Sequence, residues 1–346
     1  MKEALYYEKL DNNRVRCLLC PHRCTLQPHA VGFCRVRRNK DGRLYSLNYS
    51  CAVSVALDPI EKKPLYHFNP GSLILSAGTF GCNFRCSWCQ NWTIAHGDDR
   101  TDGEETASGI GKSSTGDENE KAAEGEGANP ADRAAADHAD HKDQKDSDPA
   151  DALPSPYDWS RTVELTPEGL AALAAKYAPR GSIGVAYTYN EPTVWYEFVL
   201  DTSRLVKEQG LANVLVTNGF IGIEPLKELL KYVDAMNIDV KAFTEEFYAR
   251  YCKGSLEHIK KTVELAAQKC HVEITTLVIP GLNDSPGEIG RLAEWLSGID
   301  PNIVLHLTRF FPGYRLTNIG PTPRSTLEKA RESALMHIKH VYLGNV

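Results

Sequence analysis

Short apolar, β-branched runs alternate with longer helical patterns through most of this 346-residue chain. The runs occupy residues 73–77, 183–189, 213–217, 235–239, 272–279, 304–307 and 340–343. Because repeated strand–helix–strand units build a parallel sheet with right-handed crossovers, this order restricts the fold to the α/β class. Two architectures remain, an open doubly wound sheet and a barrel.

The residues that follow these runs favour the barrel. Cysteines, an Asn-Glu-Pro sequence and further Asn, Asp and Lys residues stand at the ends of the first four runs. In barrels the loops after the strands converge on one rim, where the chemistry takes place. No Gly-x-Gly-x-x-Gly pattern follows any run, which counts against a doubly wound dinucleotide-binding sheet.

Some helix starts can also be predicted. Thr166 precedes a proline, as a capping residue does before a helix that begins with proline. Ser285 and Glu288 have the spacing of a capping box, in which each side chain accepts from the other residue's backbone N–H. The same spacing recurs at Ser325 and Glu328. We expect a capped helix at all three places.

Residues 97–160 differ in composition from the rest of the chain. They contain 18 acidic and 6 basic residues and few large apolar side chains. Such a segment buries too little apolar surface to offset the entropy lost on ordering, so we predict an acidic disordered insert. The insert divides the chain into an N-terminal Cys-rich region (1–64) and a barrel formed by 65–96 and 161–346.

The insert also accounts for the acidity of the chain. The formal charge is −6, and the insert alone carries −12, so the remainder carries +6. A chain with net negative charge is not a broadly basic nucleic-acid binder, and we expect no nucleic-acid partner. A mildly basic barrel instead suits an anionic protein partner.

The ten cysteines have to be interpreted for a reducing compartment. No run approaches the ~18 apolar residues of a membrane span, and residues 1–13 are too polar and acidic for a targeting peptide. We therefore expect a cytoplasmic protein without a membrane partner, in which thiols stay reduced. Clustered cysteines then favour metal sites, whereas the isolated Cys51, Cys252 and Cys270 are typical of small buried side chains.

Cys82, Cys86 and Cys89 form a C-x3-C-x2-C loop directly after the first run. Three thiolates at this spacing can converge on one small cluster, but a closed zinc site or a fully ligated cubane needs a fourth ligand. A four-iron cluster with three protein ligands leaves one iron open to an exogenous ligand. The alternative is a zinc site completed by a remote residue such as His96.

The C-x3-C-x2-C loop, with an aromatic residue before its last cysteine, resembles the signature of the radical S-adenosylmethionine (SAM) enzymes. The chain is most similar to the branch of the pyruvate formate-lyase activating enzymes, and within it to the AmmeMemoRadiSam-system radical SAM proteins. The similarity covers about 1–96 and 160–346, with the motifs at 65–68, 78–84, 187–192, 237–242 and 278–284. It implies a partial (β/α)6 TIM-type barrel of the radical SAM kind with a small N-terminal Cys-rich extension.

The resemblance also implies cofactors. Cys82, Cys86 and Cys89 match the ligands of a [4Fe-4S] cluster whose open iron chelates SAM. One electron then cleaves SAM, and a 5′-deoxyadenosyl radical removes a hydrogen atom from the substrate. The residues expected to contact SAM or the cluster are Trp88, Asn190, Glu191, Asn218, Asp239 and Lys241.

A structural role is the alternative for several of these residues. Trp88 is equally a core aromatic by composition. Glu191, which precedes a proline, could simply start the next helix. Asp239 and Lys241 lie on the same face of their strand and could form a purely structural ion pair.

Cys17, Cys20, Cys24 and Cys34 offer four further thiolates, with two, three and nine residues between them. Four thiolates can close a structural zinc site or hold a complete iron–sulfur cluster, and the sequence leaves both open. The spacing is not that of the bacterial ferredoxin run. We predict a second metal site, with zinc or a second iron–sulfur cluster.

The leading functional hypothesis is a radical SAM oxidoreductase of the activating-enzyme kind, which places a glycyl radical on a partner enzyme under anaerobic conditions. Radical modification of a small molecule, together with Memo-like and AMMECR-like proteins, is one alternative. A non-enzymatic metal or electron-transfer protein is another. We expect reduced flavodoxin or ferredoxin to supply the electron to either enzyme.

Overall fold

Residues 1–97 and 157–346 are described by the computed structural model, and they belong to one compact unit. The predicted acidic insert lies outside the described residues, except for residues 97 and 157–160. Where the description resumes, Tyr157 is buried and its ring stacks on that of Phe80, with 4.8 Å between the ring centroids. The proposed boundary at residue 64 stays a prediction.

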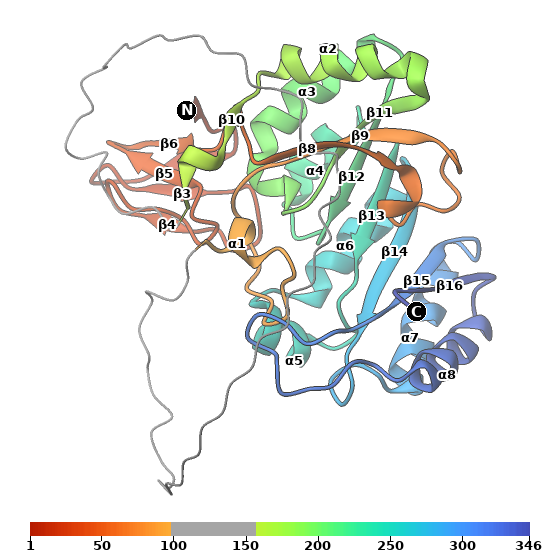
Figure 1. Cartoon of the computed structure of the whole chain (residues 1–346). Coiled ribbons are helices and arrows are strands. Elements are labelled where there is room, and N and C mark those ends of the chain that lie inside the picture. Colours follow the sequence, from red (N-terminus) through yellow and green to blue (C-terminus); the bar gives the residue numbers. More distant parts are fainter. Residues whose placement is uncertain (98–156) are drawn as a thin grey trace, which may run out of the picture. The chain divides into compact units, whose positions relative to one another are not determined.

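The central sheet has eight strands in the order β16-β15-β14-β13-β12-β11-β9-β8 (Figure 1). They are β8 (Ser54–Pro59), β9 (Leu73–Gly78), β11 (Ser182–Tyr187), β12 (Ala212–Thr217), β13 (Ala235–Asp239), β14 (His271–Val278), β15 (Val304–Arg309) and β16 (His340–Gly344). The strands from β9 to β16 are parallel, and β8 pairs antiparallel with β9. Because spatial order follows chain order, each crossover adds the next strand at the same edge. The result is an open partial barrel, which confirms the predicted fold class.

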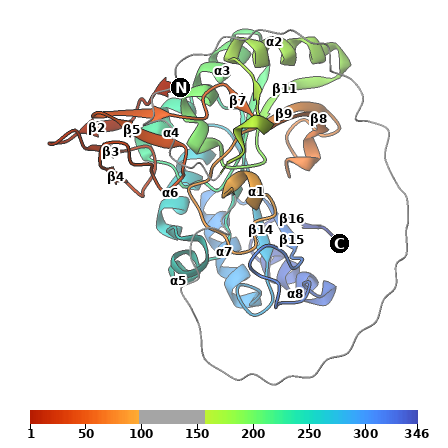
Figure 2. The same cartoon turned by 60° about the vertical axis from the view of Figure 1, so that its left-hand side comes forward.

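Helices between the strands cover the outer face of the sheet (Figures 1 and 2). The longer ones are α2 (Pro167–Tyr177), α3 (Tyr196–Glu208), α4 (Ile223–Leu229), α6 (Leu256–Ala267), α7 (Pro286–Ile299) and α8 (Arg324–Leu335). The short ones are α1 (Trp92–Ala95), α5 (Glu245–Phe247), η1 (Ile60–Lys62), η4 (Trp159–Arg161), η5 (Ala178–Arg180), η6 (Pro192–Trp195) and η7 (Tyr248–Cys252). Each longer helix buries apolar side chains on one side, as an amphipathic helix packed on a sheet does.

The N-terminal region consists of short antiparallel strands. They are β1 (Lys2–Glu3), β2 (Tyr7–Lys9), β3 (Val15–Cys17), β4 (Thr25–Leu26), β5 (Arg37–Lys40), β6 (Arg43–Ser46) and β7 (Cys51–Ala52). One sheet has the order β1-β6-β5 and another the order β2-β3-β4, while β7 pairs with β10 (Val163–Glu164). Arg37 fastens this region to the barrel, because its buried guanidinium forms a two-point ion pair with the buried carboxylate of Glu197 on α3, at 3.1 and 2.6 Å.

The helix-start predictions had different outcomes. Thr166 caps α2 as predicted, because its Oγ1 accepts from the Gly169 N–H at 3.1 Å. The capping box at the start of α7 is wrong, because Glu288 accepts from the backbone N–H of Phe243 at 2.7 Å, a tertiary contact that takes its side chain away from the cap. The box at α8 is also wrong: the helix begins at Arg324, so Ser325 and Glu328 lie inside it.

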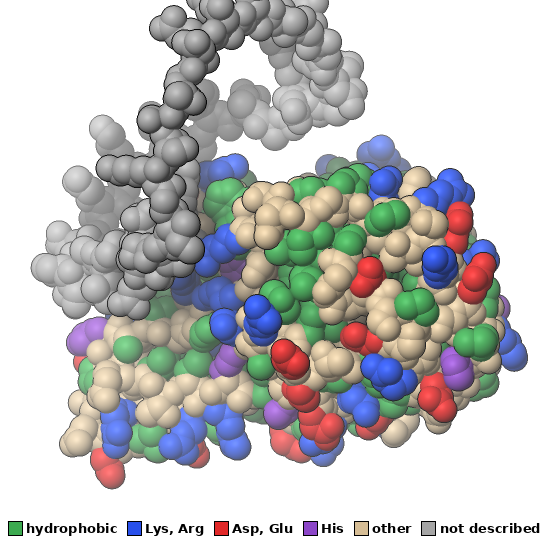
Figure 3. Space-filling view, turned by 90° about the horizontal axis from the view of Figure 1, so that it is seen from below, with side chains coloured by type: hydrophobic (Ala, Val, Ile, Leu, Met, Phe, Trp, Pro, Cys, Tyr) green, Lys and Arg blue, Asp and Glu red, His purple; other side chains and the backbone are tan. Residues whose placement is uncertain are grey.

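The surface carries mixed charge. On the face shown in Figure 3, Lys and Arg side chains are interspersed with Asp and Glu side chains. Among the described residues, no helix combines the length and the apolar composition needed to cross a bilayer.

Candidate functional site

The three-cysteine loop leaves the carboxyl end of β9 through a crowded passage. At Gly78 a Cβ atom would come within 2.5 Å of the backbone oxygen of Thr188. Gly81 has a φ of 98°, and a Cβ atom there would lie 2.9 Å from the side chain of Val36. Only glycine fits this passage without a shift of the neighbouring chain. The loop then places Cys82, Cys86 and Cys89 as free thiols within or partly within the core.

Asn190 holds the backbone that enters this loop. Its Oδ1 accepts from the N–H of Thr79 at 3.1 Å, and its Nδ2 donates to the carbonyl of Gly81 at 2.8 Å. Both polar groups of the side chain are therefore engaged by the end of β9 and the first turn of the loop. The structure shows how Asn190 positions the loop, and the predicted contact with SAM stays a prediction.

Asn83 and Asn218 join the loop to the end of β12. The side-chain Nδ2 of Asn218 donates to Oδ1 of Asn83 at 2.9 Å and lies 3.8 Å from Sγ of Cys82. The Oδ1 of Asn218 accepts from the Phe220 N–H at 2.9 Å, while Asn83 donates to the carbonyl of Phe220 at 2.7 Å. Asn218 is thus placed beside the first cysteine, although most of its hydrogen-bonding capacity is used within the protein.

Glu191 lies beside this group and is almost fully buried, with 2% of its surface exposed. Its Oε1 accepts from the Thr193 N–H at 2.9 Å and from the Thr217 hydroxyl at 2.7 Å, and its Oε2 accepts from the Asn218 N–H at 2.8 Å. Burial raises the pKa of this carboxyl group against the opposing effect of these hydrogen bonds. A carboxylate offers about four acceptor positions, so one remains on Oε2. Glu191 therefore both caps η6, as the structural alternative requires, and keeps one acceptor position.

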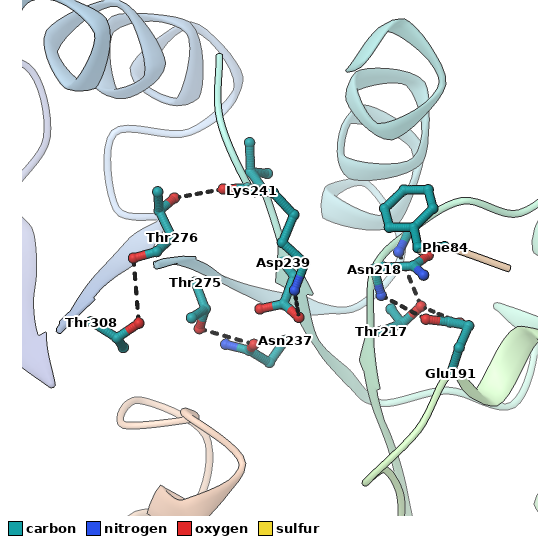
Figure 4. Close-up of polar contacts among 12 residues, drawn as sticks. Phe84, Glu191, Thr217, Asn218, Asn237, Asp239, Lys241, Thr275, Thr276 and Thr308 are labelled. Atoms are coloured by element: carbon teal, nitrogen blue, oxygen red, sulfur yellow. Dashed lines mark hydrogen bonds and ion pairs between the residues drawn. The ribbon is translucent and has the colours of Figure 1, made fainter. Parts of the chain in front are cut away.

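Asp239 and Lys241 form an ion pair at the end of β13, with 2.6 Å between Oδ2 and Nζ. Figure 4 shows the pair between Glu191 and Asn218 on one side and Thr275 and its neighbours on the other. Burial lowers the pKa of Lys241, but the charges of Asp239 and Cys86 outweigh it, and the net shift is upward. The pair therefore keeps a positive charge close to the three-cysteine loop.

Trp88 is buried, with 6% of its surface exposed. Its ring packs on Phe247, with 5.4 Å between the ring centroids. This places Trp88 in the main hydrophobic core, the role that its composition alone suggested. A contact with the cluster stays a prediction.

The structure adds residues to the site that sequence reasoning missed. Cys252, at the end of η7, is fully buried as expected, but its thiol donates to Cys86 and lowers the pKa of that group. Its carbonyl also accepts from the Arg85 N–H at 2.9 Å. Tyr248, one helical turn earlier, accepts from the Lys241 N–H at 2.9 Å. No spacing pattern relates 252 to the loop, so the sequence carried no signal for this contact.

The floor of the barrel is a second polar network. Glu273 accepts from His271 at 2.9 Å, from His306 at 2.6 Å, and from the backbone N–H groups of Tyr66 and His67 at 2.9 and 2.7 Å. Burial alone would raise the pKa of Glu273, but these four donors lower it to about 2. The side chain of His306 thus stabilises the barrel interior.

The donor sets differ from a site for one bare ion. Within residues 1–97 and 157–346, no three Cys, His, Asp or Glu side chains converge closely enough to bind a single metal ion. A preformed zinc site that combines the loop with His96 is therefore absent from these residues. Three separate thiols on one loop fit a polynuclear cluster, in which each cysteine binds a different iron.

A partial α/β barrel with three cysteines on the loop after its first parallel strand defines a class of protein that binds an iron–sulfur cluster at the barrel rim. The family model described as the radical SAM superfamily matches residues 77–296, from the end of β9 to α7. The chain belongs to the radical SAM superfamily.

Relatives at greater resolution of family give the branch. The chain is 38% identical to an uncharacterized protein of Methanocaldococcus jannaschii, over all of this chain and 86% of that protein. It is 29% identical to the pyruvate formate-lyase-activating enzyme of Clostridium pasteurianum, over 42% of this chain and 63% of that enzyme. The branch of the activating enzymes is thus supported. The AmmeMemoRadiSam placement stays a prediction.

One solved structure similar to this chain is a domain of the pyruvate-formate lyase-activating enzyme from Bacteroides vulgatus. It is 18% identical to this chain, with a TM-score of 0.41, and the match covers 46% of this chain and 98% of that domain.

Proposed function

We propose that this protein is a radical SAM enzyme that removes a hydrogen atom from its substrate. The observation that carries the proposal is the position of the three-cysteine loop at the carboxyl rim of the barrel, fastened there by Asn190 and by the Asn83–Asn218 pair. Such fixation suits a site in which a cluster and its ligand must keep one relative geometry.

Cys82, Cys86 and Cys89 would hold the [4Fe-4S] cluster that the family implies. When bound, the cluster and SAM supply the one-electron cleavage that produces a carbon-centred radical able to remove a hydrogen atom. Burial raises the pKa of the Cys82 thiol well above its ordinary value, so the bare thiol stays protonated. Cluster binding must therefore displace that proton, and the charge of Lys241 beside Cys86 favours the thiolate form.

The rim residues would orient SAM. The acceptor position that remains on Glu191 suits an ammonium group, and the Asp239–Lys241 pair offers one acceptor group and one donor group to a zwitterion. These assignments rest on the resemblance and on the position of each residue on the same rim.

For the substrate, we propose a glycine of a partner enzyme, because the chain is similar to activating enzymes for glycyl radical enzymes. The reducing partner would be a flavodoxin or ferredoxin, and a body of net charge +6 would attract such an acidic protein. The setting would be the anaerobic cytoplasm. The alternative with Memo-like and AMMECR-like partners stays a prediction.

The test of the enzyme proposal is reductive SAM cleavage. Protein reconstituted anaerobically with iron and sulfide, then reduced with dithionite in the presence of SAM, should form 5′-deoxyadenosine. Cys86→Ala should abolish this product, whereas Cys270→Ala should retain it, because Cys270 bonds only to the carbonyl of Ala266 among its printed contacts and lies outside the loop. Absence of product from the reconstituted wild type would refute the proposal.

The glycine proposal needs a separate test. Glycyl radical enzymes from the same cell, labelled with deuterated glycine, should transfer deuterium into 5′-deoxyadenosine. Product that forms without deuterium from any of them would leave the enzyme proposal standing and would refute the glycine as its target.

A further inference from the structure

The four N-terminal cysteines converge on one cavity beside the barrel. Cys17 ends β3, Cys20 and Cys24 lie in the turn that leads to β4, and Cys34 lies in the turn that leads to β5. All four line the same cavity, together with His22, Arg37 and Asn83. None of the four is in a disulfide. The cavity is therefore surrounded by the kind of donor that binds soft metals and metal–sulfur clusters.

The arrangement of the sulfur atoms does not fit a preformed zinc site. In tetrahedral zinc sites the Zn–S bond is about 2.3 Å, so the ligand sulfurs lie about 3.7 Å from one another. In the described residues no three Cys, His, Asp or Glu side chains show such convergence. The catalytic cysteines Cys82, Cys86 and Cys89, which match a cluster-binding family, share this wider arrangement. Four cysteines around a cavity without single-ion convergence are typical of a cluster with one cysteine on each iron.

Arg37 supplies an independent sign of a missing acceptor. Its side chain is 2% exposed and lines the cavity, with its charge close to Cys17 and Cys34. Two of its guanidinium nitrogens bind Glu197, but the Nε–H finds no acceptor in the part of the chain that the structure describes. A buried donor without a partner costs about 1–3 kcal/mol. The sulfide or thiolate sulfur of an anionic cluster would accept this hydrogen bond.

The cavity adjoins the catalytic loop. His22 Nε2 lies 2.8 Å from the carbonyl oxygen of Asn83, the residue that follows Cys82. Arg85 donates to the carbonyl of Phe33 and stacks on its ring, with 4.3 Å between the guanidinium carbon and the ring centroid. The carbonyl of Cys34 lies 3.0 Å from the Cβ position of Gly81. The N-terminal site is thus in direct contact with both ends of the segment that carries the first catalytic cysteine.

We propose that Cys17, Cys20, Cys24 and Cys34 bind an iron–sulfur cluster, separate from the one at the three-cysteine loop, with the Arg37 Nε–H as a hydrogen-bond donor to it. The site needs four thiolates and loses four thiol protons on loading. It does not depend on SAM cleavage, so it stands or falls independently of the proposed reaction.

The test is metal and sulfide analysis of protein isolated anaerobically from cells grown with both iron and zinc. The wild type should contain about eight irons and eight sulfides per chain, since each cubane has four of each, and no stoichiometric zinc. Cys82→Ala/Cys86→Ala/Cys89→Ala should keep about four irons and an iron–sulfur absorption band. About four irons with one zinc in the wild type, or about four irons with no second metal, would overturn the proposal.

Two further variants make the result specific. Cys20→Ala/Cys24→Ala should lose about four irons, whereas Cys270→Ala should lose none. If the triple variant fails to fold, the wild-type iron-to-zinc ratio still decides the question. Arg37→Met should retain the iron but shift the EPR g-values or midpoint potential of the N-terminal cluster. An unchanged spectrum and potential would refute the hydrogen bond from Arg37.

Discussion

Substitution of Asn190 by alanine tests whether this residue positions the cluster loop. The change removes one hydrogen bond from the Thr79 N–H and one to the Gly81 carbonyl, at 3.1 and 2.8 Å. A net value of about 1 kcal/mol for each hydrogen bond gives a loss of about 2 kcal/mol in the free energy of unfolding. For a domain of this size such a loss lowers Tm by about 4–8 °C.

The assay is thermal and urea unfolding of the metal-free protein, so that cluster loss does not contribute. Asn190→Asp is the matched variant, because its carboxylate can still accept from Thr79 but cannot donate to Gly81. It should therefore destabilise the protein through the Gly81 contact while it keeps the Thr79 contact. If Asn190→Ala leaves Tm unchanged in the metal-free protein but abolishes SAM binding, Asn190 is a cofactor ligand and the positioning argument is wrong.

Three further predictions concern stability and the rim. The folded-state pKa of Glu273 is about 2, below its ordinary 4.5, so its stabilising contribution is present above pH 4.5 and is lost as the pH falls toward 2; Glu273→Gln should flatten acid unfolding in that range, and an unaltered acid limb would contradict the assignment. Glu191→Gln turns one acceptor into a donor facing either Thr217 or the Asn218 N–H, and should cost about 1–3 kcal/mol in urea unfolding as well as weaken SAM binding; full SAM affinity would show that the carboxylate is only structural. Thr166→Ala removes the cap of α2 and should cost about 1 kcal/mol, with Thr166→Ser as the control that retains it; equal stability of the two variants would contradict the cap.

The sequence was sufficient for the parallel sheet because each core strand is a short apolar run between helical patterns. The predicted run at 235–239 coincides with β13, and the run at 213–217 lies within β12. The antiparallel edge strand β8 was missed, since its residues Ser54–Pro59 are mostly half-buried and show no strong pattern. The short N-terminal strands were missed for a similar reason, because two or three residues are too few for a periodicity.

The site shows the same limit at the level of single residues. Strand ends and cysteine spacing were enough to bring Cys82, Glu191, Asn218 and Asp239 to one rim. They could not show that most hydrogen-bonding positions of Glu191 and Asn218 are used within the protein, because that depends on the path of the backbone between strands. The approach of Cys252 to Cys86 likewise depends on η7, a π-helical turn without a sequence signal.

The central claim is that SAM binds directly to a cluster held by Cys82, Cys86 and Cys89. The most direct measurement is the EPR spectrum of the dithionite-reduced protein, recorded with and without SAM, in the wild type and in Cys86→Ala. We predict a reduced [4Fe-4S] signal whose g-values change on addition of SAM in the wild type, and the loss of this SAM-sensitive signal in the variant. A reduced cluster whose spectrum is indifferent to SAM, or a SAM-sensitive signal that survives in Cys86→Ala, would contradict the claim.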